Sequence, residues 1–182
     1  GPADSVAARE GSGQGPSLHV MLLSMFRVGS PETSEQRHGY YDLRWRILRA
    51  PWGQPRGSER DALEDEAEHV AVWDGDGRLV GVGRLHLNNR REAQIRYMAV
   101  EEDCRETGIG RTILRRLEEL ACARGADQIV LNARANVVEF YRRNGFVRMG
   151  QGPTLFGEVE HVVMVKPLHP EEGTPGGGAT VS

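Results

Sequence analysis

The segment that most constrains the fold is residues 93–124, in which a strand pattern, a glycine-rich loop and a helical pattern follow one another. The letters AQIRYMAV at 93–100 are typical of a β-strand, whereas the apolar residues after the loop recur every three or four positions. Between them, CRETGIGR at 104–111 places Gly108 and Gly110 where the helix should start. Glycine there costs about 1 kcal/mol relative to alanine. We therefore expect a compensating role, such as binding a phosphate.

The start of this helix has the features of an anion site. The apolar face that predicts the helix over 109–124 consists of Ile109, Ile113, Leu114, Leu117, Leu120 and Ala121. Unpaired backbone amides and the positive end of the helix dipole favour an anion there. Because Gly108 and Gly110 lack side chains, a phosphate could approach the backbone, and Arg105, Arg111 and Arg115 add positive charge.

The rest of the pattern predicts a mixed α/β fold. Strand 128–132 (QIVLN) is almost wholly apolar, which is typical of a strand buried on both faces. The other elements are expected as helix 34–49, loop 50–61, strands 69–73 and 78–87 joined by a hairpin turn, a second turn at 88–92, strand 93–100, helix 136–143, and strands 146–149 and 159–166. The last strand could pair with a second subunit as an edge strand, so a monomer and a homodimer are both compatible with the sequence.

Length and composition limit the class of protein. The 182 residues suit one domain, expected over 21–168, with a flexible lead-in at 1–20 that begins with a tag remnant and a flexible tail at 169–182. The net charge of −3 without a charge block argues against a nucleic-acid partner, and no apolar run approaches the ~20 residues of a membrane span. Two cysteines without metal-ligand spacing favour a cytoplasmic protein without a metal site.

Comparison with known phosphate motifs identifies a family. The Walker loop needs a Gly-Lys-Ser/Thr ending, and the dinucleotide motif GxGxxG has a different spacing. The pattern Gln/Arg-x-x-Gly-x-Gly/Ala, matched by Arg105, Gly108 and Gly110, resembles that of the GNAT superfamily of acetyl-CoA-dependent N-acetyltransferases. The strand IRYMAV before it and LNARANVVEFYRRNGF at 131–146 are also similar to signatures of that family. The resemblance covers roughly residues 26–167.

The resemblance implies the GNAT fold, a mixed and mostly antiparallel sheet of six to seven strands flanked by helices, with acetyl-CoA as co-substrate. In the family the central strand diverges from its neighbour and offers backbone groups to the pantetheine arm, while the glycine loop holds the pyrophosphate. The implied cofactor-binding residues are Met98, Ala99, Val100, Arg105, Glu106, Thr107, Gly108, Ile109, Gly110, Arg111, Asn132, Asn136 and Tyr141.

The same resemblance suggests catalytic residues. Tyr141 matches a tyrosine that protonates the leaving thiolate, although it could equally pack against the sheet. Gln94 matches the position of a glutamate base in many relatives, but an amide cannot take a proton. The base could instead be His69, His86 or His161, since histidine titrates near neutral pH, or a chain of water molecules. Tyr141, Gln94 and His161 are the catalytic candidates that we carry forward.

The acceptor site is expected beside the same strand. Arg84 and Arg96 lie on adjacent strands and suggest a carboxylate or phosphate on the acceptor, although ion pairs with Glu64, Glu66 or Glu68 are as plausible. Strict alternation would place Gln94, Arg96 and Met98 on one face unless a bulge intervenes. Trp52, in the loop after the first helix, is a further candidate for substrate contact.

A narrower resemblance keeps a second function open. Residues 40–61, 80–88 and 161–167 resemble the acetyltransferase-like N-terminal half of two-domain bacterial proteins whose other half is a hot-dog, thioesterase-like domain. Members of that group are linked to acyl-carrier and malonyl chemistry. The expected function is therefore acetyl transfer from acetyl-CoA to the amine of a small acceptor, which could carry an anionic group. The alternative is acyl-CoA or acyl-carrier binding or malonyl-thioester decarboxylation in the same pocket.

Overall fold

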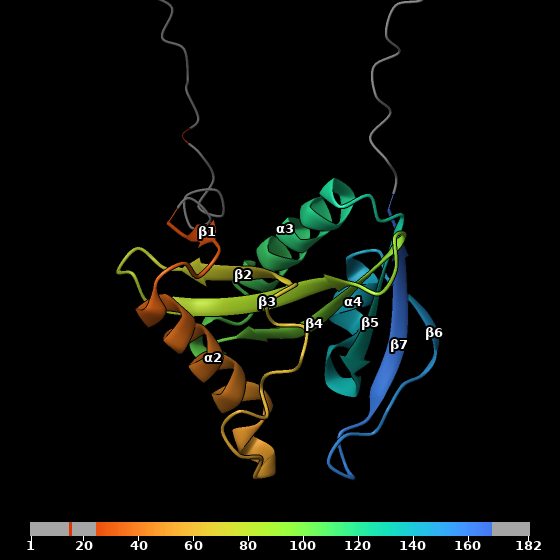
Figure 1. Cartoon of the computed structure of the whole chain (residues 1–182), viewed down its shortest axis with the longest axis horizontal. Coiled ribbons are helices and arrows are strands. Elements are labelled where there is room, and N and C mark those ends of the chain that lie inside the picture. The colour runs from red at the N-terminus through yellow and green to blue at the C-terminus, as the bar shows by residue number, and fades with distance from the viewer. Residues whose placement is uncertain (1–14, 16–24, 169–182) are drawn as a thin grey trace, which may run out of the picture.

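A single seven-stranded sheet forms the centre of the protein, with strand order β1-β2-β3-β4-β5-β7-β6 (Figure 1). The computed structural model describes residue 15 and residues 25–168, so the expected lead-in and tail lie mostly outside the described residues. The elements are β1 Arg27–Gly29, α2 Ser34–Leu48, η1 Ala50–Trp52, β2 Glu68–Trp73, β3 Leu79–Leu87, β4 Glu92–Val100, η2 Glu102–Cys104, α3 Ile109–Ala123, β5 Gln128–Arg134, η3 Ala135–Val137, α4 Val138–Arg143, β6 Val147–Gln151 and β7 His161–Pro167. The mixed, mostly antiparallel sheet predicted from the sequence is confirmed, with β4 and β5 as its parallel pair.

Each expected helix and strand has a counterpart whose ends differ from the prediction by one or two residues. The helix α2 begins at a capping box, in which the Thr33 hydroxyl accepts from the Gln36 amide at 3.1 Å and the Gln36 side chain accepts from the Thr33 amide at 3.2 Å. It ends just before Pro51, which cannot supply the next amide hydrogen. No helix within the described residues is both long and apolar enough to cross a bilayer.

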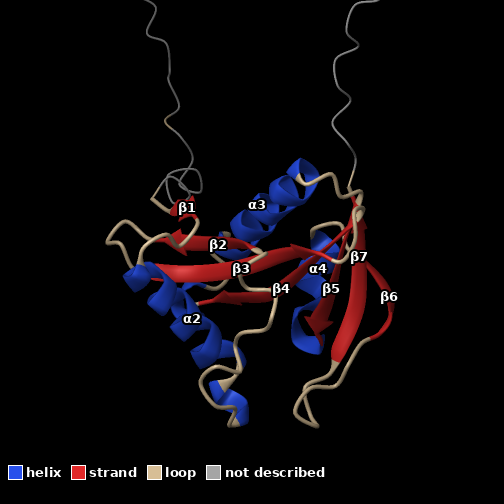
Figure 2. Ribbon diagram, viewed as in Figure 1, coloured by secondary structure: helices blue, strands red, loops and turns tan. Residues whose placement is uncertain are grey.

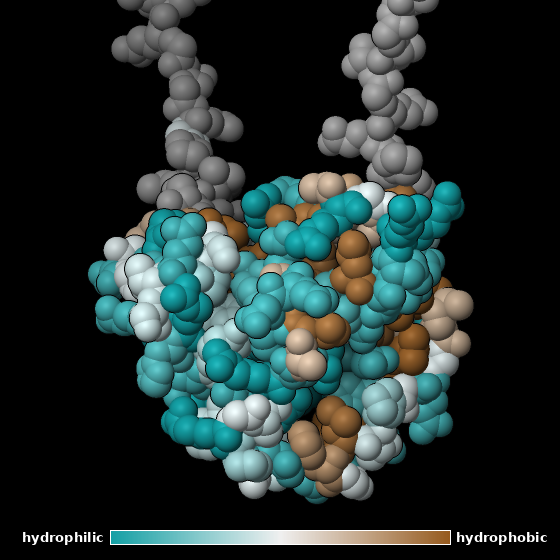
Figure 3. All heavy atoms as spheres, in the orientation of Figure 1, coloured by the Kyte–Doolittle hydropathy of each residue, from teal (hydrophilic) through white to brown (hydrophobic). Residues whose placement is uncertain are grey.

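The two faces of the sheet carry different helices. The larger apolar cluster lies between the sheet and the helices α3 and α4, and the smaller one lies under α2. Gly81 and Gly83 on β3 permit the close approach of α3, because a Cβ at Gly83 would lie 2.7 Å from a methyl of Ile113. The space-filling view of the molecule is largely hydrophilic, with separate hydrophobic patches (Figure 3).

A bulge in β4 changes which side chains share a face. On β3, Val82 pairs with Ala99 of β4, and Arg84 pairs with Arg96. Two steps along β3 therefore correspond to three steps along β4, so β4 has one extra residue at this point, where Tyr97 has a φ of 57°. After the bulge, Tyr97 packs on the α2 side and Met98 on the α3 side. The bulge is the exception that the sequence analysis allowed, and because of it Met98 does not share a face with Gln94 and Arg96.

Three other expectations differ from the structure. β7 lies between β5 and β6, so it is no edge strand, and the sheet ends at β1 and β6. β5 buries only every second residue and leaves Asn132 exposed, so its burial on both faces is also wrong. The short strand β1 was not predicted, because three residues are too few to produce a periodic pattern.

The packing of α3 on Gly83 generates a stability prediction. We expect Gly83→Ala to lower the free energy of unfolding by about 1–3 kcal/mol, because the added methyl must displace Ile113 and Leu117. Urea denaturation of both proteins measures the difference. Gly150→Ala on β6 is the control, since its Cβ would meet nothing within 4 Å, and it should change stability by less than about 0.5 kcal/mol. Equal effects of the two substitutions would contradict the argument.

Candidate active site

The sheet opens between β4 and β5. Their parallel pairing runs from Glu92 opposite Gln128 to Ile95 opposite Leu131 and stops there, although β4 continues to Val100 and β5 to Arg134. Figure 2 shows the two strands starting side by side and then running apart. Beyond Ile95 the backbone of β4 therefore has one edge that is not paired with β5, as expected for the strand that receives an extended ligand arm.

Tyr141 on α4 lies beside this opening. Its hydroxyl donates to the Met98 sulfur at 3.4 Å, and its ring packs edge-on against Phe140 and Phe146. Burial raises the pKa of Tyr141, so the hydroxyl keeps its proton at neutral pH. Because a thioether is only a weak acceptor, a stronger acceptor in the opening could take over this hydrogen bond. The ring of Tyr141 thus packs against its neighbours, while its hydroxyl holds a proton that a ligand in the opening could accept.

The glycine loop has the geometry of an anion site. Gly108 is the N-cap of α3 with a φ of 89°, and Glu106 also adopts a left-handed conformation. Within the described residues, no backbone amide from Glu106 to Arg111 donates a hydrogen bond to another protein group. A Cβ on Gly110 would lie 3.2 Å from the Phe140 ring. Each glycine therefore has a structural reason, backbone conformation at Gly108 and packing at Gly110, and together they leave a row of free donors.

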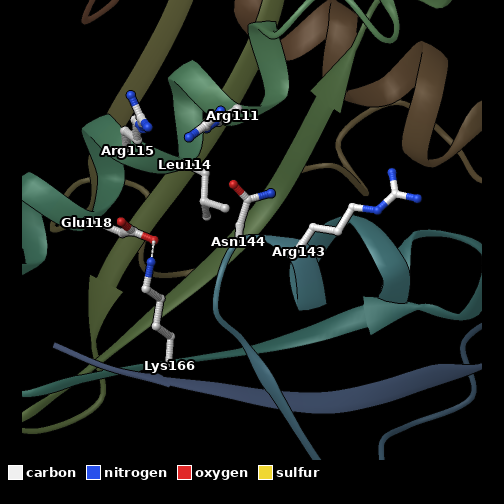
Figure 4. A pocket seen from close by; sticks show the side chains of 7 residues that line it. All are labelled: Arg111, Leu114, Arg115, Glu118, Arg143, Asn144 and Lys166. Atoms are coloured by element: carbon white, nitrogen blue, oxygen red, sulfur yellow. Dashed lines mark hydrogen bonds and ion pairs between the residues drawn. The ribbon is translucent and has the colours of Figure 1, made fainter.

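A basic pocket continues from this loop along α3 (Figure 4). Its lining residues are Arg111, Leu114, Arg115, Glu118, Arg143, Asn144 and Lys166. Glu118 and Lys166 form an ion pair of 2.8 Å, whereas Arg111 and Arg115 pair with no carboxylate in the described part of the chain. Only Arg111 had been expected in a binding site, with Arg115 as a nearby charge. Leu114 and Glu118 lie on the same helix, α3. Arg143 at the end of α4, Asn144 after it and Lys166 on β7 come from distant parts of the sequence, and no local motif links them to α3.

A network of buried charges lies on the α2 side of the sheet. Arg84 is fully buried and holds Asp61 at 2.6 Å and Glu64 at 2.7 Å, and Arg96 binds Asp61 at 2.9 Å. Burial alone would raise the pKa of Asp61, but the hydrogen bond and charge of Arg84 outweigh it and lower this pKa. Arg84 therefore forms ion pairs within the protein, which is the alternative that the sequence had left open, and is not free for the expected contact with substrate. The half-buried Arg96 is also engaged by Asp61.

His69 is held inside the same network. Its Nε2 donates to the Glu64 carbonyl at 2.7 Å, and its Nδ1 lies 2.9 Å from the Tyr40 hydroxyl. Burial lowers the pKa of His69. With both ring nitrogens engaged by protein groups, His69 has no free lone pair for an amine proton.

His86 and Gln94 are linked to each other through Asn88. The Arg84 guanidinium donates to His86 Nδ1 at 3.1 Å, while His86 Nε2 donates to the Asn88 oxygen at 3.0 Å. Asn88 in turn donates to the Gln94 oxygen at 3.0 Å, within the closed part of the β4–β5 pairing. Burial lowers the pKa of His86. Both side chains therefore serve this polar chain and lie before the opening.

His161 differs from the other two histidines. Its Nδ1 faces the carbonyls of Pro153 and Val159, each at 3.0 Å, so that nitrogen carries the hydrogen of the neutral ring. Nothing within residues 25–168 hydrogen-bonds to its Nε2. Burial lowers the pKa of His161, so the ring is neutral at pH 7. It lies opposite Arg134 in the β5–β7 ladder, past the point where β4 and β5 separate.

The remaining expected residues lie around the same opening. Asn132 is exposed on β5, and Asn136 is exposed in η3, the turn that follows. Trp52 is half-buried at the end of η1, with the Arg134 guanidinium 4.4 Å from its ring. The structure therefore brings Trp52, Arg134 and His161 together, from three elements that are distant in the sequence.

Comparison with known proteins agrees with this geometry. The model of the Acetyltransferase (GNAT) family matches residues 37–146. The chain belongs to the GNAT family. Two relatives from Bacillus subtilis (strain 168) are the uncharacterized N-acetyltransferases YjcF, 29% identical over 135 residues (74% of this chain, 95% of YjcF), and YitI, 25% identical over 134 residues (70% and 89%).

Solved structures show the same GNAT fold. An acyl-CoA N-acyltransferase from Pseudomonas aeruginosa has a TM-score of 0.65 at 21% identity, covering 78% of this chain and 97% of that one. An aminoglycoside 6'-N-acetyltransferase complexed with coenzyme A has a TM-score of 0.69 at 18% identity, covering 81% and 99%. The match to the family model and the relatives in Bacillus subtilis, rather than these structures, show that the chain is an acyl-CoA-dependent N-acetyltransferase.

The buried charge network of this acetyltransferase generates a prediction with a pH dependence. We expect Arg84→Met to lower the free energy of unfolding at pH 7 by about 3–5 kcal/mol, because Asp61 and Glu64 lose their buried counter-charge. In the wild type both carboxyls have a lowered pKa in the folded state, so their contribution is present above pH ~4 and is lost as the pH falls below it. The variant should therefore lose less stability on acidification.

Urea denaturation at pH 7 and pH 3.5 measures both effects. The matched control is Arg78→Met, which removes an exposed pair with Asp103 and should change stability little at either pH. If Arg84→Met has the same free energy of unfolding at pH 7 as the control Arg78→Met, the buried network does not stabilise the fold as argued.

Proposed function

We propose that this acetyltransferase transfers an acetyl group from acetyl-CoA to the amine of a small acceptor. The observation that carries the proposal is the opening between β4 and β5, with the free amides of residues 106–111 at the start of α3 and the Tyr141 hydroxyl beside it. An extended thioester with a diphosphate at one end is complementary to an unpaired strand edge that leads to a helix N-terminus.

The donor would lie along the α3 side of the opening. Its pyrophosphate would accept from the amides of Glu106 to Arg111, and its pantetheine arm would follow the backbone of β4 from Met98 to Val100 across from Asn132 and Asn136. The basic pocket with Arg115 would receive the phosphate on the ribose of coenzyme A.

The transfer itself requires three functions of the protein. A backbone amide of β4 after the bulge polarises the thioester carbonyl, which favours attack by a neutral amine. As the C–N bond forms and the C–S bond breaks, Tyr141 donates its proton to the departing thiolate. The amine proton leaves to a base, for which we favour His161 Nε2, the histidine nitrogen without a protein partner, or a water molecule that it holds.

A second candidate is binding or decarboxylation of a malonyl thioester in the same pocket. The observation that favours it is Gln94, an amide tied to Asn88 where a catalytic carboxylate would stand in many relatives. Release of carbon dioxide from malonyl-CoA without any amine would support this candidate. Release of free thiol from acetyl-CoA only when an amine is present would support the first. Both reactions suit the cytoplasm, where free thiols such as Cys104 and Cys122 stay reduced.

The role of the Tyr141 hydroxyl is tested by Tyr141→Phe. We expect kcat for thiol release from acetyl-CoA to fall about 100-fold or more, because the thiolate loses its proton donor. Calorimetry should show unchanged acetyl-CoA affinity, since the ring and its packing remain. If the variant keeps full activity, Tyr141 is a packing residue and the proton comes from elsewhere.

The position of the donor is tested by Arg115→Gln. We expect about a tenfold weaker affinity for coenzyme A but little change for dephospho-coenzyme A, which lacks the ribose phosphate. Arg116→Gln is the matched control, because the neighbouring side chain pairs with Glu119 on the surface of α3. The same loss with both ligands would contradict a ribose-phosphate contact, and no calorimetric heat with any coenzyme A thioester would overturn the proposed function.

A further inference from the structure

Two arginines from distant elements meet on the α2 side of the opening. Arg49 follows the last residue of α2, and Arg134 is the last residue of β5. Arg49 Nη1 donates to the Leu48 carbonyl at 2.9 Å, and Arg134 Nη2 donates to the same oxygen at 3.0 Å. Arg49 Nε also donates to the Ser58 carbonyl at 3.0 Å. Two guanidinium groups therefore converge on the Leu48 carbonyl, and these three backbone contacts satisfy only part of their hydrogen-bonding capacity.

Among residues 25–168, neither of these arginines forms an ion pair. Within the described residues, no carboxylate lies within 4.0 Å of Arg49 or Arg134, whereas the other buried arginines, Arg44 and Arg84, bind Glu64 and Asp61 directly. This is unusual for Arg49, because the residue is only 6% exposed and buried arginines are normally paired with a carboxylate.

The two charges also disfavour each other. Burial lowers the pKa of Arg49, and burial followed by the charge of Arg49 lowers the pKa of Arg134. The negative charge of Glu59 acts in the other direction and raises the pKa of Arg49. The Glu59 carboxylate, however, accepts from the Gly57 amide at 2.6 Å and does not bind the Arg49 guanidinium. A bound anion would relieve both the desolvation and the repulsion of this pair.

Aromatic rings and a histidine surround the pair. The Arg49 guanidinium lies 5.4 Å from the Tyr97 ring, on the bulge of β4, and 5.3 Å from the Phe156 ring, while the Arg134 guanidinium lies 4.4 Å from the Trp52 ring. Figure 1 places η1 and the loop between β6 and β7, which carry the latter two rings, at the same end of the molecule. His161 faces Arg134 across the ladder. The arginines thus lie in a partly aromatic surrounding beside the diverging ends of β4 and β5.

The position of the pair separates it from the phosphates of the donor. Arg49 and Arg134 are on the α2 side of the sheet, whereas the free amides of residues 106–111 and the basic pocket are on the side of α3. An anion between the two arginines would therefore belong to the other substrate.

We propose that the acceptor amine also carries a carboxylate or phosphate group, and that Arg49 and Arg134 bind it beside the opening. This inference rests on the proposed acetyl transfer and names the substrate class of that site. The anion site consists of Arg49 and Arg134, in place of the expected pair Arg84 and Arg96, which internal carboxylates already occupy. A planar guanidinium pair suits either oxyanion, and the aromatic rings suit an apolar spacer between the anion and the amine.

Matched amines with and without the anion provide the test. The pairs are 4-(aminomethyl)benzoate with benzylamine for a carboxylate and phosphoethanolamine with ethanolamine for a phosphate. Each is measured by thiol release from acetyl-CoA and, independently of catalysis, by thermal shift of the full chain with coenzyme A present. We expect at least one anionic amine to exceed its neutral partner about tenfold in kcat/KM and to raise the Tm where the partner does not.

Substitution of one arginine identifies the site. Arg134→Gln should remove the preference for the anionic amine, measured within the variant as the ratio of kcat/KM between the anionic amine and its neutral partner, and should remove the thermal shift with the anionic amine. Arg91→Gln, at a side chain 82% exposed in the turn before β4, is the matched control and should keep the preference. If Arg134→Gln fails to fold, Arg49→Lys, which keeps the charge but not the planar fork, should weaken the preference in the same two assays.

The outcomes separate this inference from the proposed function. Anion-dependent thermal shifts that disappear in Arg134→Gln support the anion site even if no amine is acetylated. Acetylation of neutral and anionic amines with equal kcat/KM overturns the anion site and leaves acetyl transfer intact. An absence of thermal shift with both anionic amines, or a preference unchanged in Arg134→Gln, also overturns it.

Discussion

The separation of β4 from β5 is the constraint on which the rest of the structure depends. It follows from the extra residue at Tyr97, because a bulge increases the local twist of a strand and directs it away from its neighbour. The same bulge places Met98 toward Tyr141 and α3, and Tyr97 toward α2 and the arginines. In the proposed reaction, this one local irregularity would give the two substrates access to the same strand from opposite faces of the sheet.

Two groups of arginines on the α2 side of the sheet satisfy their charges in different ways. Around the closed part of β4, Arg84 binds Asp61 and Glu64, so its buried charge has carboxylate partners within the protein and the network serves stability. Around the open part, Arg49 and Arg134 have backbone partners but no carboxylate within the described residues. Buried charge that the protein itself leaves unmatched is a feature of binding sites, and it accounts for the acceptor class that we infer.

Much of the donor side could be predicted from the sequence, because it is local. Residues 105–110 lie in one loop, and the period of the next fifteen residues places that loop at a helix start, so the free amides follow directly. The acceptor side could not be predicted in this way. Arg84 and Arg96 were plausible anion ligands only while the position of Asp61 was unknown, and a carboxylate from a loop cannot be placed by strand periodicity.

The sequence by itself determined the order and type of the helices and strands other than β1, the glycine loop at the start of a helix and the membership of the GNAT family, since each depends on residues close together in the chain. Only the tertiary structure decided where β4 bulges, that β7 lies inside the sheet, and that Arg49, Trp52, Arg134 and His161 share one site. The physical reason is that pairing between strands and the neutralisation of buried charge depend on contacts between segments distant in sequence, which no local pattern encodes.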